Sequence, residues 1–229
     1  MAKPVQEINA GSMADIAFLL LIFFLVTTTM DVDKGLMRKL PPMPQEEKTK
    51  QPPIEIKERN IFVVLVNKND ELLVENRFMN VDKLKEEAIT FISNPEGLET
   101  FPERRMITES FAKEELAKAQ VYYASNPNDE KSKEAVKNWE NRLNAVKLVG
   151  DYWESKQVIS LQNDNGTSYG MYIAVQNELV AAYNQLRDDL SMNKFGKKFM
   201  HLNKEQSDAV SEVYPQRISE AEPKNIGGK

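Results

Sequence analysis

Cysteine is absent from the 229-residue chain, and histidine occurs once, as His201. Without cysteine the chain can form neither a disulfide framework nor a thiolate metal site, and it has no cysteine nucleophile. His201 has no catalytic partner near it in the sequence, so we expect an ordinary surface or half-buried side chain. Phosphate-binding glycine loops and nucleophile clusters are missing too, and we expect a protein that is not an enzyme and holds no cofactor or metal.

The chain also lacks a large excess of either positive or negative charge. The 35 acidic and 30 basic residues give a net charge of −5, so the chain has no basic excess of the kind that nucleic-acid binders carry. Strongly apolar runs are equally scarce. A single one, at residues 16–30, stands out from an otherwise hydrophilic chain.

The apolar run is short for a membrane span by itself. Fifteen residues at about 1.5 Å each give roughly 22 Å of helix, against a hydrocarbon core of about 30 Å. Asp31 and Asp33 close the run on one side, whereas Met13 and Ala14 extend it on the other. We therefore predict a transmembrane helix over residues 10–30, with Asp15 inside it as the only ionisable side chain.

Asp15 is the candidate functional residue. An ionised carboxylate within a span costs about 2.5–3.5 kcal/mol on insertion scales, so such a group can take up and release a proton near physiological pH. Helical geometry predicts a common face for Asp15 and five further residues, which would line a wet pore or contact a protein partner rather than lipid. These pore-face residues are Phe18, Leu19, Ile22, Val26 and Thr29.

Two other interpretations of this segment must be weighed. Ser12 and Asp15 have the spacing of a capping box, in which Asp15 would only cap the helix at the membrane interface. The residues alone leave that alternative open. A secretory signal peptide is disfavoured, because the charged region before the run is thin and no small-x-small cleavage site follows Thr29.

Residues 8–24 resemble the single membrane segment of the ExbD/TolR family of biopolymer-transport proteins. In that family an Ile-Asn element, here Ile8-Asn9, precedes a short gap, a lone aspartate and a Leu/Ile/Phe-rich run. This chain has Gly11-Ser12 where many members have Thr-Pro, and both pairs start helices. The resemblance assigns to Asp15 the family's proton-translocating role, with protons as the coupling ion.

The resemblance also implies a location and partners. It implies a single-pass subunit of a Gram-negative inner membrane, with a cytoplasmic amino terminus and a periplasmic carboxy-terminal domain. The subunit would pair with its own copy inside a ring, expected to be a pentamer, of polytopic proteins like ExbB or TolQ. It would pass proton-motive energy to a TonB-like protein for outer-membrane transport. The alternatives are a TolR-like envelope-integrity subunit and a passive membrane-anchored periplasmic adaptor.

Orientation is where the charges disagree with the resemblance. The positive-inside rule finds Lys3 on one side of the run and Lys34, Arg38 and Lys39 on the other. That count would place the carboxy-terminal domain in the cytoplasm. We follow the resemblance, because a short leader gives the rule little to count.

The rest of the chain divides by composition. Residues 1–9 form a leader and residues 31–53 a tether with five prolines, which at about 3.1 Å per residue could reach roughly 70 Å. The tether is either a plain linker or a segment that meets partner chains. A folded domain is predicted over residues 54–219, followed by a flexible tail at 220–229.

The domain pattern predicts an α+β fold. Strands at 61–66 and 72–74 form a hairpin, and a helix at 81–92 follows, which Asn94-Pro95 ends. A strand at 157–161 closes onto the hairpin, and Tyr169-Gly170 precedes a long helix at 171–192. This order is similar to the small sandwich-like periplasmic domain of ExbD/TolR proteins. A helix within 199–214, started by Asn203 and stopped by Pro215, and an edge strand at 216–219 complete the domain.

Residues 96–156 interrupt the family pattern with a predicted helical-hairpin insertion. Its helices are expected at 111–123 and 130–153, separated by Asn126-Pro127. Six residues of the second helix follow alternating steps of three and four, which favours packing against the first helix over docking of a partner. They are Val136, Trp139, Leu143, Val146, Gly150 and Trp153.

Overall fold

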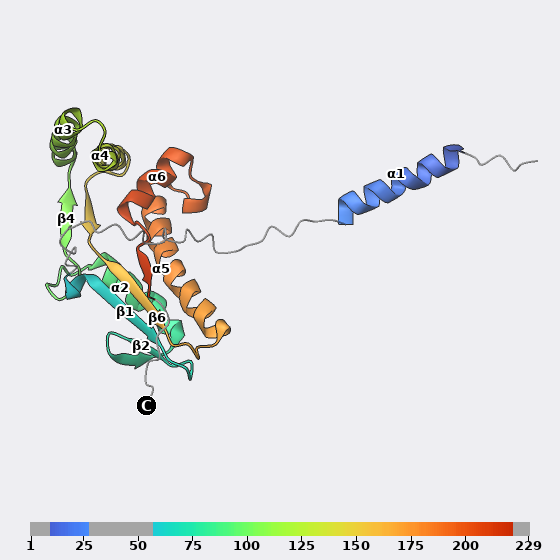
Figure 1. Cartoon of the computed structure of the whole chain (residues 1–229), viewed down its shortest axis with the longest axis horizontal. Coiled ribbons are helices and arrows are strands. Elements are labelled where there is room, and N and C mark those ends of the chain that lie inside the picture. Colours follow the sequence, from blue (N-terminus) through green and yellow to red (C-terminus); the bar gives the residue numbers. More distant parts are fainter. Residues whose placement is uncertain (1–9, 28–56, 222–229) are drawn as a thin grey trace, which may run out of the picture. The chain divides into compact units, whose positions relative to one another are not determined.

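A computed structural model describes residues 10–27 and 57–221 (Figure 1). They belong to two separate compact units. The first is α1 (Ala10–Thr27), and the second is a domain from Lys57 to Ala221. The predicted leader, tether and tail, and the pore-face residue Thr29, lie outside the described residues.

A five-stranded mixed sheet organises the domain, in the order β3-β2-β1-β6-β7. The strands are β1 (Ile61–Val66), β2 (Leu72–Val74), β3 (Arg77–Met79), β6 (Val158–Asn163) and β7 (Ile218–Glu220). β1 pairs antiparallel with β2 and parallel with β6, which confirms the predicted hairpin and the strand that closes onto it. β7 lies at the edge, where an edge strand is predicted, and it pairs parallel with β6, which was not predicted. Of the five strands in this sheet, only β3 was not expected.

The main core lies on one face of this sheet. Along β1 the side chains of Phe62, Val64 and Val66 are buried, and the alternate ones are half-exposed, as expected of a strand covered on one side. Helices α2 (Leu84–Ser93) and α5 (Tyr169–Phe195) supply the covering layer. The domain is therefore a two-layer α+β fold, in agreement with the predicted fold class.

Local signals set the helix ends in this layer. Asn94 adopts a left-handed conformation, with φ of 40°, at the carboxy end of α2, where the Asn-Pro pair predicted a stop. Ser168 caps α5 by accepting a hydrogen bond from the Met171 amide. Because of this cap, Tyr169 and Gly170 form the first turn of the helix rather than preceding it.

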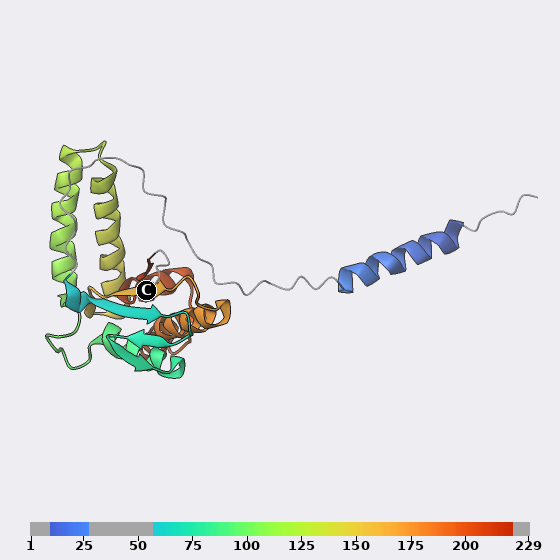
Figure 2. The same ribbon diagram turned by 60° about the horizontal axis from the view of Figure 1, so that its bottom comes forward.

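The insertion is a helical hairpin on a two-stranded stem. α3 (Glu109–Ser125) and α4 (Glu130–Val149) lie side by side and project from the domain (Figure 2). Below them β4 (Arg104–Ile107) pairs antiparallel with β5 (Tyr152–Ser155). The prediction that the second helix continues to Trp153 is wrong. The helix ends at Gly150, whose φ of 81° is a value that glycine adopts readily and other residues rarely do. The residues after it pair with β4 instead.

A second core joins the insertion to the carboxy-terminal part of the domain. It is formed by residues of the stem, of both insertion helices and of α6 (Lys204–Val213): Ile107, Ala112, Leu143, Ala145, Val146, Val149, Tyr152, Ala209, Val210 and Val213. The seam residues Leu143 and Val146 are buried in it, so the predicted packing role is confirmed for them. The hairpin is thus not an independent appendage.

The predicted helix at 199–214 is in fact two elements. A short 3-10 helix, η3 (Phe199–His201), comes before α6. Asn203 separates them because it forms a capping box with Gln206, which fixes the start of α6. His201 is exposed, as expected of a surface side chain.

Candidate functional site

Helix α1 carries the predicted site residues. The helix begins at Ala10, upstream of Asp15, so the expected backward extension of the apolar run is confirmed. Every side chain from Met13 to Phe23 is exposed, including Asp15. Phe18 and Leu19 are 60% and 59% exposed, and Ile22 is 41% exposed.

Helical geometry places these residues in one row. Residues three and four apart are neighbours on a helix surface, so Asp15, Phe18, Leu19 and Ile22 follow one another along one face of α1. Val26 belongs to the same helix four residues further on. By length and hydropathy, no helix among the described residues qualifies as a membrane span.

A buried ion-pair cluster fixes the insertion to the domain. Glu154, 7% exposed on β5, accepts hydrogen bonds from Arg105 at 2.7 Å and Arg142 at 2.6 Å. These arginines come from β4 and α4, so the carboxylate joins the stem to the hairpin. Arg217, just before β7, lies 3.9 Å from the same carboxylate.

Aromatic rings and a second carboxylate complete this Glu154 cluster. The Arg142 guanidinium lies 4.6 Å from the centre of the Trp139 ring, and Trp139 meets Phe111 edge-on at 5.7 Å. The seam residue Trp139 therefore packs against α3, as predicted. Arg142 also approaches Glu212 of α6 at 3.5 Å.

The pKa values of the two carboxyl groups in the cluster are shifted in opposite directions. Burial opposes the charge of Glu154, but the hydrogen bond from Arg105 and the positive charge of Arg142 hold its pKa below the ordinary value of 4.5. Burial raises the pKa of Glu212, whose contact with Arg142, at 3.5 Å, is longer than the two hydrogen bonds that Glu154 accepts. The cluster is therefore built around an ionised Glu154.

A second buried contact links the long helix to the sheet. Tyr183 of α5 is fully buried, and its hydroxyl donates to Oε1 of Gln157 at 2.8 Å and accepts the Arg217 amide at 3.2 Å. The Gln157 amide group in turn donates to the Pro215 carbonyl at 3.3 Å. One hydroxyl thus joins α5 to the starts of β6 and β7.

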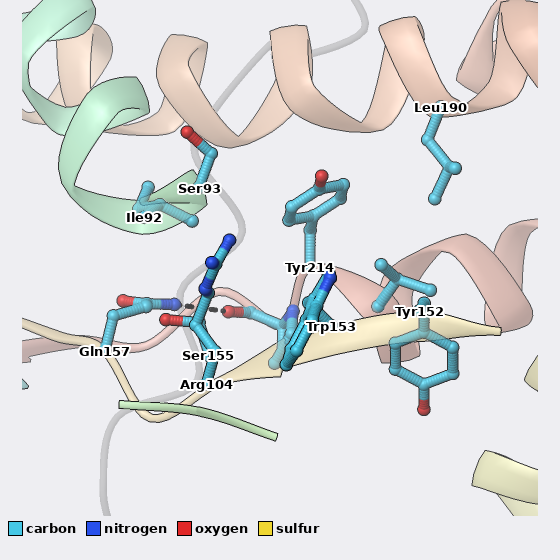
Figure 3. Close-up of a pocket in the computed structure, with 11 residues that line it drawn as sticks. Ile92, Ser93, Arg104, Tyr152, Trp153, Ser155, Gln157, Leu190 and Tyr214 are labelled. Atoms are coloured by element: carbon cyan, nitrogen blue, oxygen red, sulfur yellow. Dashed lines mark hydrogen bonds between the residues drawn. The ribbon is translucent and has the colours of Figure 1, made fainter. Parts of the chain in front are cut away.

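A cavity of about 230 Å³ opens beside these contacts (Figure 3). Its walls come from the ends of α2 and α6, from α5 and from the stem of the insertion: Ile92, Ser93, Arg104, Tyr152, Trp153, Ser155, Gln157, Leu190, Val213, Tyr214 and Pro215. The cavity lies in the domain, and none of the predicted site residues of α1 lines it.

Comparison with known protein families decides what the chain is. A family described as "Biopolymer transport protein ExbD/TolR" matches residues 1–187. The chain belongs to the ExbD/TolR family. As an ExbD/TolR protein it is an energy-transducing accessory subunit of biopolymer transport. No curated protein and no solved structure matches it.

The match to the ExbD/TolR family ends within α5. α6 and β7 lie beyond residue 187. The hairpin insertion packs on α6 through the second core. The insertion, which departs from the expected ExbD/TolR pattern, thus packs on α6, which lies carboxy-terminal to the matched residues.

The sequence did not reveal the Glu154 cluster or the cavity. Arg105 and Glu154 are 49 residues apart, so no local motif connects them. The alternation of the buried Tyr152 and Glu154 with less buried neighbours appears only in the structure, because one of the two buried residues is charged and Trp153 between them is apolar. It was hidden by the three- and four-residue spacing that runs through α4 into Trp153.

Proposed function

We propose that this chain is the proton-responsive subunit of a motor driven by the proton-motive force, and that the Asp15 carboxyl binds and releases the coupling proton. One observation supports the proposal above others. Asp15 is the only charged residue of α1, and apolar side chains surround it on a helix that begins before it. A helix that is apolar all round belongs in lipid or among other helices.

The proposed span consists of α1 and its neighbours in the sequence. At about 1.5 Å per residue, the 18 residues of α1 measure about 27 Å, slightly less than a hydrocarbon core of about 30 Å. Ile8, Asn9 and residues 28–30 on either side are uncharged. With them the segment has the length of a span.

The row from Asp15 to Ile22 is the proposed contact with other subunits. All its described side chains are exposed, and a carboxyl group facing lipid would be costly. The proposed neighbours are a second copy of the helix and a ring, expected to be a pentamer, of ExbB- or TolQ-like proteins in the inner membrane. Each proton that crosses 100 mV provides about 2.3 kcal/mol for movement.

The proposed output is force on a TonB-like protein in the periplasm, applied through the tether and the domain. The Glu154 cluster and the second core give the hairpin a firm attachment, which a force-bearing element needs. The alternative client is a TolR-like envelope system. A passive membrane-anchored adaptor is the third candidate. The cap role considered for Asp15 does not fit α1, because the helix begins five residues before Asp15 and its first turn holds no acidic residue.

Reconstitution tests the proposal directly. The full chain is co-purified with its polytopic partner, counted by native mass spectrometry and placed in vesicles with an internal pH dye. We expect proton entry that depends on an imposed potential and on the presence of this chain. Equal proton entry with and without the chain would favour the adaptor.

A further inference from the structure

The cavity of Figure 3 lies at a junction between two parts of the domain. Ile92 and Ser93 come from α2 of the sheet core, whereas Arg104, Trp153 and Ser155 come from the stem of the insertion. The end of α6 and the residues after it form the remaining wall. Junctions of this kind are common places for binding sites.

Arg104 is the polar group that characterises the cavity. It extends from the stem towards Ser93 and Ile92, next to the Trp153 ring (Figure 3). Its guanidinium lies 4.8 Å from the centre of that ring. Gly97 makes room for it, because a Cβ there would lie 2.6 Å from Nη2 of Arg104.

No carboxylate pairs with Arg104 within residues 10–27 and 57–221. The neighbouring cations differ in this respect. Arg105 pairs with Glu154, and Lys156 pairs with Glu103 at 3.0 Å. Arg59 also pairs with Glu103. Among the described residues, Arg104 is therefore a cation at the edge of the cavity with no anion paired to it.

A second polar group is available nearby. The Ser155 hydroxyl is buried and has no hydrogen-bond partner in the described parts of the chain. The Gln157 side chain, by contrast, is occupied by Tyr183 and the Pro215 carbonyl. Unused donors therefore gather on the stem side, and the facing walls are mostly apolar, with Ile92, Leu190 and Val213.

The size and chemistry of the cavity limit its ligand. Small-molecule sites usually measure about 300–1,000 Å³, so about 230 Å³ suits one or two amino-acid side chains rather than a whole cofactor. An unpaired guanidinium favours a carboxylate, with which it can form two parallel hydrogen bonds. The apolar walls favour aliphatic groups beside that carboxylate. They lack the many donors and acceptors that a sugar would need.

We propose that this cavity binds an acidic side chain with an apolar neighbour, presented by a peptide segment of a partner protein. Arg104 binds the carboxylate, the Ser155 hydroxyl donates a further hydrogen bond, and the apolar neighbour fills the space beside Leu190. The Trp153 ring, 48% exposed, lies beside the Arg104 guanidinium at the wall of the cavity. The proposal depends on the proposed function only in taking a protein of the same complex as the partner.

Peptide binding to the full-length protein in detergent tests this assignment. The probes are the blocked peptides acetyl-Ala-Leu-Glu-Leu-Ala-amide and its counterpart with glutamine in place of glutamate. Binding is followed by calorimetry and by Trp153 fluorescence in a Trp139→Phe background, which leaves one tryptophan. We expect the acidic peptide to bind at least about tenfold more tightly, since a charge-assisted hydrogen bond contributes at least that much.

Variants separate the cavity from general electrostatics. Arg104→Gln should abolish the tenfold preference, and Arg104→Lys, which retains the charge, should keep part of it. Arg77→Gln is the matched control, because exposed Arg77 on β3 lines no part of the cavity. The preference should also persist in Asp15→Asn protein, so a failure of the motor proposal would not affect this measurement.

Several results would overturn the assignment. Equal binding of the two peptides, or binding of neither, would remove the carboxylate site. An equal loss with Arg77→Gln would reduce the effect to surface charge. Tighter binding of glucuronate than of the acidic peptide would replace the peptide with a carboxylated sugar.

Discussion

Glu154 and Arg142 form a hydrogen-bonded ion pair at 2.6 Å that joins strand β5 to helix α4. The carboxylate is almost fully buried, and Arg105 binds its other oxygen. An ionised group at such a depth is stable only while its partners are present. This pair therefore makes the attachment of the hairpin sensitive to single substitutions and to pH.

Replacing Glu154 with glutamine should destabilise the domain strongly. The substitution leaves Arg105 and Arg142 without their anion, and removing one partner of a buried pair typically costs about 3–5 kcal/mol. We expect that loss in the free energy of unfolding, measured in urea at pH 7. Glu140→Gln, on the exposed side of α4, is the control and should change it by less than about 0.5 kcal/mol. Similar losses in both variants would contradict the role of the cluster.

The effect of Glu154 should depend on pH. Its pKa is below 4.5 in the folded protein, so its contribution is present above pH 4.5 and is lost as the pH falls through the lower folded value. Glu212, with a raised pKa, acts in the opposite direction and stabilises most at low pH. We therefore expect the difference in unfolding free energy between wild type and Glu154→Gln to shrink below pH 4.5. A difference that stays constant down to pH 2 would exclude this explanation.

Tyr183→Phe tests the contact between α5 and the sheet. The variant loses the hydroxyl that joins Gln157 to the Arg217 amide, and leaves buried polar groups unpaired at a cost of about 1–3 kcal/mol. We expect this loss in thermal or urea unfolding. Tyr169→Phe is the control, because Tyr169 is 78% exposed and its hydroxyl should not matter. No difference between the two variants would show that the buried hydroxyl contributes nothing.

Asp15→Asn should abolish transport driven by the proton gradient, although the protein still inserts and assembles. Asparagine retains the size and the capping ability of aspartate but cannot exchange a proton. Ser12→Ala is the control, because it removes a polar side chain one turn earlier in α1 without touching the carboxyl. Transport should survive in Ser12→Ala. Equal impairment of both variants, or normal transport in Asp15→Asn, would contradict a proton-carrying role of Asp15.

Shortening the hairpin should be tolerated where complete removal is not. A deletion of residues 105–156 would take away Glu154 and the part of the second core that covers α6. A deletion of residues 119–136, closed by a short loop, leaves that core in place. We expect a single unfolding transition and unchanged proton flow in the shortened protein, with weaker coupling to the client. Loss of the assembled complex would contradict the expectation that the tip of the hairpin serves coupling to the client and not assembly.

Local sequence patterns predicted most of the elements but not their partners. The alternation in β1, the Asn-Pro stop after α2 and the caps at Ser168 and Asn203 depend on neighbouring residues, so they can be recognised in the chain itself. β4 and β5 were missed because each is four residues long and forms only by pairing with the other. The predicted second helix of the insertion was too long for the same reason. Helical spacing alone cannot show that the residues after Gly150 leave the helix and pair with another strand.

The sequence alone determined that a lone Asp15 begins an apolar helical run and that an α+β domain of the ExbD/TolR type follows, because helix and strand periodicity and residue order are local properties. The tertiary structure decided that the insertion stands on a strand pair, shares a core with α6 and is held by Glu154. It also decided that Arg104 borders a cavity and has no carboxylate partner in the part of the chain that the structure describes. These features depend on contacts between residues dozens of positions apart, and only the packing of the folded chain brings such residues together.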